Sequence, residues 1–256
     1  MPRRVMTYVV LALVGLLALP AAALSASGGS GLDPSGGLGG PGNPGSPGVR
    51  SGTTPVTATS NGITLTTTSS ALLRNTLGFA GTAPAGRAGL TLEIQRLGHE
   101  TNWQWTPTAQ ATINGDGTFS TNWMTNHIGR FLVRAVIGGT SASAASASGP
   151  PTVATTVYRT SIATLYGPGL FGRRTACGPR LTRSTVGLAN RTLKCGSLVA
   201  VYYRGRTLNV PVIDRGPYAN GADWDLTMAA ARALGITGTA RIGAVSLPTA
   251  PAAPAP

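Results

Sequence analysis

Short runs in which apolar and polar residues alternate dominate the chain between residues 56 and 140. The runs are GITLTTTSS, LTLEIQRLG, ATINGDGTFSTNW and GRFLVRAVIG, with turn residues between them. Alternation of this kind is typical of strands that bury one face, and the Asn-Gly-Asp-Gly segment at 114–117 favours a hairpin turn. Several short strands at this spacing predict an all-β domain, a β-sandwich of the immunoglobulin-like type.

Three tryptophans, Trp103, Trp105 and Trp123, belong to this first region. On an exposed sheet face they would offer sugar rings a stacking surface, whereas most tryptophans of small domains are largely buried. We expect all three in the core. The cysteine pair typical of immunoglobulin domains is missing from this region, so the predicted sandwich rests on the strand pattern alone.

A second apolar region, residues 155–248, is again rich in short strand-like runs: TSIATLYG, SLVAVYYRG and RTLNVPVID. Only one segment has helical character. Thr227 is a suitable N-cap, residues 228–234 are good helix formers, and Gly235 stands where a glycine ends many helices. The pattern predicts a small β-barrel that carries one short helix.

Segments rich in glycine, serine, alanine and proline separate these regions, and they cannot bury enough apolar surface to offset the entropy of ordering. The N-terminus differs, because Arg3 and Arg4 precede an apolar run and then small residues, an order typical of a secretory signal peptide. The predicted division is 1–25 signal peptide, 26–55 flexible linker, 56–140 sandwich, 141–154 linker, 155–248 barrel and 249–256 disordered tail.

The apolar run after Arg4 is shorter than the roughly 20 residues of a membrane span. We therefore expect cleavage and export to the cell wall or an equivalent periplasmic space, with no membrane attachment afterwards. An uncleaved N-terminal anchor is the alternative.

The chain has two cysteines, Cys177 and Cys195, and an even pair in an exported protein predicts a disulfide. A catalytic thiol would need a nearby base, and zinc would need further ligands. Both histidines, His99 and His127, lie in the first region. We expect a disulfide, and neither a metal nor an organic cofactor.

The chain is strongly basic, with 20 Lys and Arg against 7 Asp and Glu and a formal net charge of +13. Such a surface attracts polyanions. No nucleic-acid-binding motif is recognisable, and export argues against nucleic acid as the partner. We expect peptidoglycan glycan strands and anionic wall polymers as partners, with solubility alone as the other explanation of the charge. The oligomeric state stays open.

The acidic residues cluster where basic ones dominate elsewhere: Asp214, Asp223 and Asp225 all fall within residues 212–235. Asp214 ends the run LNVPVID, and a partly desolvated carboxyl group at such a position can hold a proton near neutral pH. The alternative is an ion pair between Asp214 and a neighbouring arginine. Asp225 is either a second functional carboxylate or an acceptor near the helix N-terminus.

Three segments in this order, ATLYGPGLFGRRTACG, LANRTLKCGSLVAVYYRGRTLNVPVIDRGPY and DWDLTMAAARALG, carry a resemblance. Nearly all of residues 160–245 resembles the double-psi β-barrel of rare lipoprotein A-like (RlpA-like) proteins. The resemblance implies a six-stranded barrel that binds polysaccharide. Well-studied members are lytic transglycosylases that cut bacterial peptidoglycan, and expansins have related barrels.

The resemblance also implies roles for residues. Asp214 matches the catalytic aspartate of the family's Asp-Arg-Gly-Pro motif, and Asp225 matches the aspartate before Leu-Ser/Thr. Ordinary packing is the alternative for the aromatic residues among the expected substrate contacts, and Arg215 would either orient Asp214 or bind a peptide carboxylate. The expected substrate contacts are Tyr166, Asn190, Arg215, Tyr218 and Trp224.

This chain departs from the family at two positions. Pro179 stands where many members have Glu, and Asn190 where many have His. A conventional glycosidase needs two carboxyl groups, whereas a lytic transglycosylase needs one acid that protonates the glycosidic oxygen while the substrate's own C6 hydroxyl attacks. We therefore expect a lytic transglycosylase that leaves 1,6-anhydro-MurNAc ends. The alternative is a non-catalytic, expansin-like module that binds or loosens wall glycan.

Overall fold

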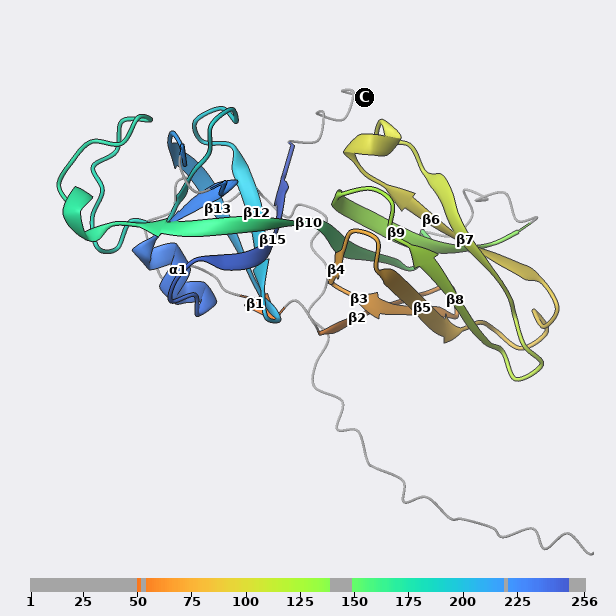
Figure 1. Ribbon diagram of the computed structural model, residues 1–256. Coiled ribbons are helices and arrows are strands. Elements are labelled where there is room, and N and C mark those ends of the chain that lie inside the picture. Colours follow the sequence, from red (N-terminus) through yellow and green to blue (C-terminus); the bar gives the residue numbers. More distant parts are fainter. Residues whose placement is uncertain (1–49, 52–53, 139–148, 219–220, 249–256) are drawn as a thin grey trace, which may run out of the picture. The chain divides into compact units, whose positions relative to one another are not determined.

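The computed structural model of the chain describes residues 50–51, 54–138, 149–218 and 221–248 (Figure 1). The predicted signal peptide and tail lie outside the described residues, as do nearly all of the linker at 26–55 and residues 141–148 of the second linker. The described part is predominantly β, as the alternating pattern predicts. Among the residues it covers, no helix has the length and apolar character needed to cross a membrane.

The first half of the described chain forms two sheets. One has the strand order β2-β3-β5-β8, and the other places β7, β6 and β9 in sequence beside the long strand β10, with β4 also paired to β10. The strands are β1 (Arg50–Ser51), β2 (Pro55–Ser60), β3 (Ile63–Thr68), β4 (Ser70–Leu72), β5 (Thr76–Thr82), β6 (Thr91–Leu97), β7 (Thr106–Thr112), β8 (Thr118–Met124) and β9 (Gly129–Ile137). A 3-10 turn, His99–Thr101, follows β6.

One apolar core lies between these two sheets, and strands from both contribute to it. Every second residue points inward, so Phe79, Phe119 and Phe131 are each almost completely buried. Trp123 is in this core, with its ring edge-on to Phe131 at 5.8 Å. The immunoglobulin-like type of this sandwich stays a prediction.

The other two tryptophans differ from the expectation. Trp103 and Trp105 are only half-buried, so the prediction that all three belong to the core is wrong for these two. The Arg134 guanidinium lies over the Trp105 ring at 4.1 Å, a contact that a ring at the sheet surface allows.

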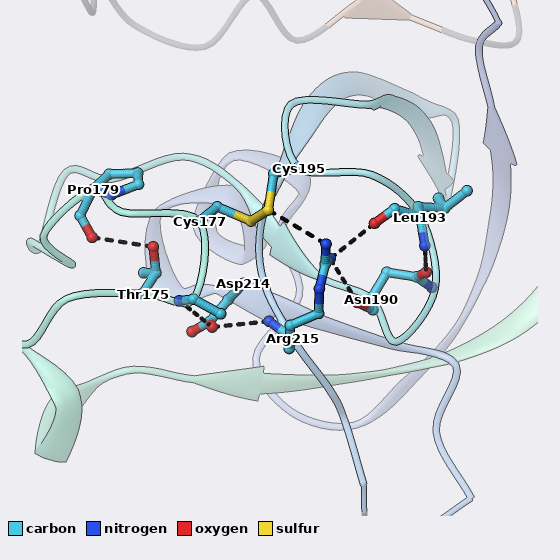
Figure 2. Close-up of a disulfide and its surroundings, with 9 residues drawn as sticks. Thr175, Cys177, Pro179, Asn190, Leu193, Cys195, Asp214 and Arg215 are labelled. Carbon is cyan, nitrogen blue, oxygen red and sulfur yellow. Dashed lines mark hydrogen bonds between the residues drawn. A yellow bond between two sulfur atoms is a disulfide. The ribbon is translucent and has the colours of Figure 1, made fainter.

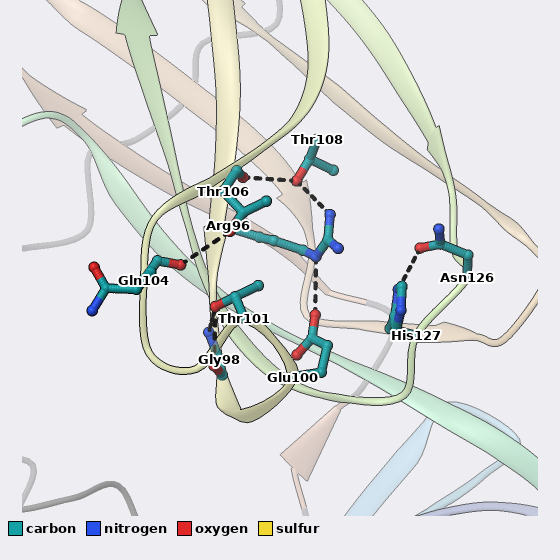
Figure 3. A network of polar contacts seen from close by, with 9 residues as sticks. All are labelled: Arg96, Gly98, Glu100, Thr101, Gln104, Thr106, Thr108, Asn126 and His127. Atoms are coloured by element: carbon teal, nitrogen blue, oxygen red, sulfur yellow. Dashed lines mark hydrogen bonds and ion pairs between the residues drawn. The ribbon is translucent and has the colours of Figure 1, made fainter.

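A buried arginine joins β6 to the turn that follows it (Figure 3). Arg96 is 8% exposed and donates from Nε to Glu100 Oε1 at 3.0 Å and from Nη1 to the Thr108 hydroxyl at 2.9 Å. Its guanidinium also lies 5.0 Å from the centre of the Trp123 ring. The charge is thus paired and hydrogen-bonded, as burial of a cation requires.

Strand β10 (Thr152–Tyr166) is shared by both parts of the fold. Its first half pairs with β9, and its second half pairs with β15 and β14 (Figure 1). The proposed limit between linker and barrel, at 154/155, falls inside this strand.

Six strands close into a barrel in the order β14-β11-β13-β12-β15-β10, and a parallel pairing of β10 with β14 completes the ring. β11 and β13 are also parallel, and the remaining neighbours are antiparallel. This confirms the predicted six-stranded barrel. The further elements are the 3-10 turn Pro168–Leu170, β11 (Leu188–Ala189), β12 (Leu198–Tyr203), β13 (Arg206–Asp214), β14 (Trp224–Thr227), α1 (Met228–Leu234) and β15 (Ala240–Ser246).

The barrel interior is filled by branched and small apolar side chains, among them Val201, Val210 and Leu226. Helix α1 packs Ala230 and Leu234 into the same core. Its ends are those that the sequence predicts.

Two residues set the limits of α1. The Thr227 hydroxyl accepts a hydrogen bond from the N–H of Ala230 at 3.2 Å, and Gly235 ends the helix in the left-handed conformation at φ 77°.

Candidate active site

Four neighbouring strands each contribute one residue to a single row, in which three residues are polar and one is small. Ala189 on β11 lies opposite Asp214 of β13 on one side and opposite Asp225 of β14 on the other, and Asp225 lies opposite Thr164 of β10. Ala189, Asp225 and Thr164 are paired in a regular register and point to the same face. The neighbouring Leu188 points into the barrel core, so this face is the outer one. Asp214 lies opposite Ala189 across a register shift between Leu188 and Ala189, and its electrostatic interactions with Asp225 and Tyr166 place its carboxylate near the same residues.

The row sets how far apart the two carboxylates are. Neighbouring strands are about 4.8 Å apart, so the Cα atoms of Asp214 and Asp225, two strands apart, are separated by roughly 10 Å. Ala189 is 3% exposed and contributes only a methyl group between them. A larger side chain at this position would fill the space between the two aspartates.

The backbone orients the Asp214 side chain (Figure 2). Its Oδ1 accepts hydrogen bonds from the N–H of Ala176 and from the N–H of Arg215, both at 2.8 Å. No hydrogen bond among the described residues reaches Oδ2, and the residue is only partly buried. One carboxylate oxygen is therefore held in place, and the other has no hydrogen-bond partner in the described ranges.

The alternative role for Asp214, an ion pair with arginine, is not adopted. The Arg215 guanidinium turns away and donates to the carbonyls of Asn190, at 3.3 Å, and Leu193, at 2.8 Å, and to Cys195 Sγ at 3.4 Å. Arg215 thus braces the loop between β11 and β12.

Asp225 is about half-buried, and its Oδ1 accepts a hydrogen bond from the Thr164 hydroxyl at 3.0 Å. Burial raises the pKa of Asp225, the bond from Thr164 partly offsets this, and the nearby charge of Asp214 adds to the increase. The site therefore contains a carboxyl group that keeps its proton to higher pH than an ordinary aspartate.

Tyr166 lies two residues beyond Thr164 and packs against Phe171, Leu181 and Ala189. Its side chain is 9% exposed, and its buried hydroxyl has no hydrogen-bond partner in the described part of the chain. Burial, and next the charges of the two site aspartates, raise the pKa of Tyr166, so the hydroxyl remains a neutral O–H donor. An unpaired buried donor of this kind is costly unless something else accepts its hydrogen bond.

Asn190 begins a tight turn after β11. Its Oδ1 accepts from the N–H of Thr192, at 3.1 Å, and of Leu193, at 2.9 Å, while its Nδ2 donates to the carbonyl of Asp223 at 3.4 Å. Its own N–H donates to the carbonyl of Asp214 at 3.1 Å. The amide of Asn190, which we expected to contact the substrate, is thus already bonded inside the protein.

A disulfide joins Cys177 to Cys195, as the sequence predicts (Figure 2). It links the loop that supplies the Ala176 N–H to the loop that contains Asn190. Pro179 has a comparable role, because its carbonyl accepts from the N–H and hydroxyl of Thr175 at 2.9 and 3.1 Å. The disulfide and these backbone bonds occupy the segments where many family members carry Glu and His.

Two further aromatic residues border the row of aspartates. Tyr218 follows the Asp-Arg-Gly-Pro turn and is 78% exposed. Trp224 begins β14, is half-buried against the barrel core, and has a buried Nε1 without a partner among the described residues. Asp223, between them in sequence, is exposed and accepts from the N–H of Ile162 at 3.1 Å.

Sequence reasoning missed three residues that shape the site. Thr164 and Ala189 carry no motif of their own, and only the strand register places them beside the aspartates. Arg191 donates to the carbonyls of Pro217, at 3.0 Å, and Ala222, at 3.1 Å, and so holds the segment after Asp214. Its position directly after Asn190 was the only signal available.

A closed barrel of six strands with two parallel pairs and a single helix belongs to the class of double-psi β-barrels. Residues 159–247 match the protein-family model described as lytic transglycolase. Together with the curated relatives below, this match places the barrel in the RlpA-like family.

Two curated proteins named "Probable endolytic peptidoglycan transglycosylase RlpA" are similar to the barrel. The one from Synechocystis sp. is 46% identical over 77 residues, which cover 29% of this chain and 24% of that protein. The one from Aquifex aeolicus is 41% identical over 81 residues, which cover 31% of this chain and 36% of that protein. The chain thus spans between a quarter and about a third of these relatives.

Among solved structures, the Streptomyces papain inhibitor (SPI) is similar over 35% of this chain and 93% of its own. Its sequence identity is 27%, and the TM-score is 0.29.

Proposed function

We propose that this protein is an exported lytic transglycosylase that cleaves the glycan strands of peptidoglycan between MurNAc and GlcNAc. One observation carries the proposal: Asp214 and Asp225 flank Ala189 in one outward row, and Asp214 Oδ2 has no partner among the described residues. The matches of the barrel to RlpA-like proteins support the substrate class.

The proposed chemistry needs one proton donor and one proton acceptor. A protonated aspartate gives its proton to the glycosidic oxygen, and the bond between that oxygen and C1 of MurNAc breaks. The C6 hydroxyl of the same MurNAc bonds to C1 and loses its proton to a carboxylate, which leaves a 1,6-anhydro ring without consuming water. Proton transfer of this kind is worth about 10²–10⁴ in rate.

We assign Asp214 as the acid and base that contacts the substrate, because the two N–H bonds to Oδ1 leave Oδ2 as the reactive atom. Asp225 supports it: its raised pKa favours the protonated form, which limits negative charge beside Asp214 and provides a second proton. The neutral Tyr166 hydroxyl is a donor for a substrate oxygen.

Sugar rings stack on aromatic faces through their C–H groups, and the exposed Tyr218 is the residue best placed for that contact. Trp224 packs against the barrel core on the other face of β14 from Asp225, so we assign it a packing role. Asn190 and Arg215 act instead as positioning residues, because their polar atoms already bond within the loops around Asp214.

The proposed setting is outside the cytoplasmic membrane, in the cell wall or an equivalent periplasmic space. The net charge of +13 suits anionic wall polymers as additional partners.

A second candidate is a non-catalytic, expansin-like module that binds or loosens wall glycan. It is favoured by Pro179 and Asn190, which replace the Glu and His of many relatives with groups that cannot shuttle protons. In this case the row of aspartates would bind sugar hydroxyls without breaking a bond.

Incubation with purified peptidoglycan separates the two candidates. The mature protein, Asp214→Asn and Asp225→Asn are compared, with Asp223→Asn as the matched control, because Asp223 lies in the same segment but outside the row. Soluble products are analysed by mass spectrometry.

Anhydro-muropeptides from the wild type and Asp223→Asn, with a loss of at least about a hundredfold in Asp214→Asn, support catalysis. Binding to sedimented peptidoglycan with no released product from any variant supports the second candidate. Equal product from Asp214→Asn and the wild type contradicts the proposed mechanism.

A further inference from the structure

A cavity of about 450 Å³ opens on the outer face of β12 and β15, formed by residues that the proposed chemistry does not use. Its volume lies within the range of small-ligand sites. It contains no acidic residue. The polar and aromatic residues that line it are Thr160, Tyr202, Tyr203, Arg204, Thr239 and Arg241.

Two arginines line this cavity from neighbouring elements. Arg204 stands in the hairpin turn directly after β12, and Arg241 lies near the start of β15, the strand that pairs with β12. Both side chains are exposed, so a ligand in the cavity can reach both guanidinium groups.

In the part of the chain that the structure describes, no carboxylate pairs with Arg204 or Arg241, and neither guanidinium donates a hydrogen bond. Arg204 does lie over the Tyr203 ring, at 5.2 Å from its centre. Each guanidinium therefore retains donors that can bind an anion bidentately.

The backbone of the hairpin between β12 and β13 is in an unusual conformation at Arg204. Arg204 has a φ of 45°, in the left-handed region that favours glycine or asparagine. An arginine at such a position is uncommon, and strained residues of this kind gather at functional sites. Glycine or asparagine would be less strained at this position, but neither carries a positive charge.

Asp214 lies at the far end of β13 from the hairpin that borders this cavity. Arg206 begins β13 beside the hairpin, and Asp214 ends it. Eight residues at about 3.3 Å each separate the two ends by roughly 26 Å along the strand. Asp225 is nearer, because the cavity residue Ala240 pairs with Ala163 of β10, which in turn pairs with Trp224. A ligand held beside the hairpin would leave Asp214 free.

We propose that this cavity is a second binding site, which takes a phosphate or carboxylate group of an anionic polymer. Arg204 and Arg241 bind the anion between them, and Tyr202 and Tyr203 contact the adjacent apolar part of the ligand. Two sources supply this chemistry outside the membrane, phosphodiester polymers and the carboxylates of peptidoglycan stem peptides.

The test uses the mature chain and three probes: soluble poly(glycerol phosphate), peptidoglycan with its stem peptides, and the same peptidoglycan after the stems are removed. Binding is measured by calorimetry for the soluble polymer and by cosedimentation for the others. The variant is Arg204→Gln with Arg241→Gln. The matched control is Arg74→Gln with Arg87→Gln, which removes the same charge outside the cavity and, at Arg74, shares a positive φ of 68°.

The cavity variant is expected to bind at least about tenfold more weakly than the wild type, because each lost hydrogen bond joined two charged groups. The control should lose much less. Loss with poly(glycerol phosphate) identifies phosphate as the source, and loss confined to stem-bearing peptidoglycan identifies carboxylate. An equal loss in the control, or a wild type that binds none of the probes, overturns the proposal.

Two further variants keep this test independent of folding and of catalysis. Arg204→Lys with Arg241→Lys retains the charge but not the bidentate geometry, and should bind at an intermediate level. Asp214→Asn should bind as the wild type does even though it is expected to release no product. The cavity variant should still release anhydro-muropeptides from short soluble glycans.

Discussion

At the scale of single residues, the two aspartates of the row differ in their surroundings. Asp214 is oriented by two backbone N–H groups, whereas Asp225 is held by the Thr164 hydroxyl, and burial raises the pKa of Asp225. Neighbouring carboxyl groups with different environments are a common basis for dividing acid and base roles. Here the difference follows from position, because Asp214 is the last residue of β13 whereas Asp225 lies within β14, beside Thr164 of β10.

The raised pKa of Asp225 predicts how stability depends on pH. The folded protein binds the Asp225 proton more tightly than the unfolded chain, so this residue destabilises the fold as pH rises from about 3.9, the unfolded value, through its higher folded value. Asp225→Asn should therefore melt at a higher temperature than the wild type at neutral pH. The difference should shrink in acid, as measured by thermal unfolding at several pH values.

Asp223→Asn is the control for that series, because Asp223 is exposed. Its melting temperature should differ little from that of the wild type at every pH. A melting temperature for Asp225→Asn that is lower than that of the wild type at neutral pH, or a pH-independent difference, would contradict the role of burial.

Ala189 leads to a second prediction at this scale. Leucine at this position would fill the space between Asp214 and Asp225 and displace one of them, which should reduce product release by about a hundredfold. Overpacking should also cost about 1–3 kcal/mol of stability. Ala189→Gly, which keeps the space open, should retain most activity, and product release is measured for both variants by mass spectrometry. Full activity in Ala189→Leu would show that the row is not the reacting centre.

At the scale of elements, the loops around Asp214 are held by covalent and backbone bonds. The Cys177–Cys195 disulfide, with a sequence separation of 18, ties together two loops that both hydrogen-bond to Asp214. Arg215 and Arg191 add bonds to backbone carbonyls of the same region. The position of one side chain thus depends on several loops that are distant in sequence.

Replacing both cysteines by serine should lower the free energy of unfolding by about 3 kcal/mol, because the open loop gains entropy in the unfolded chain. Activity should fall as well, since the Ala176 N–H is no longer held against Asp214. Urea unfolding and product release measure the two effects. Reductant should reproduce both in the wild type and leave the double variant unchanged, and an unaltered urea midpoint in the double variant would contradict this account.

At the scale of the whole molecule, charge is the dominant property. The net charge is +13, and in the part of the chain that the structure describes Arg96–Glu100 is the only ion pair. Most arginines are therefore balanced by solvent ions or hydrogen-bonded to carbonyls. Such a surface favours contact with anionic material over a broad area.

Binding to stem-bearing peptidoglycan should therefore weaken steeply with salt, because the screening length falls to about 10 Å at 0.1 M and about 3 Å at 1 M. Cosedimentation at increasing sodium chloride measures this dependence. Removal of the stem peptides, which carry most carboxylates, should flatten it. Binding that does not change with salt would mean that sugar contacts dominate and charge is incidental.

Much of the local structure follows from the sequence alone. The alternating runs predict the strands, Thr227 and Gly235 predict both ends of α1, and the even cysteine count in an exported chain predicts the disulfide. These features depend on residues close together in sequence or on chemistry that leaves few alternatives. The motif around Asp214 also predicts the barrel class.

Other features were decided only by the tertiary structure. Strand register placed Ala189 between the aspartates, and loop packing occupied the polar atoms of Asn190 and Arg215. The connection between β6 and β7 left Trp103 and Trp105 half-buried, while Trp123 in β8 entered the core. The type of a residue determines which bonds its side chain can form. Which of those bonds forms depends on neighbours that the chain supplies from distant segments, and these meet only when the barrel closes.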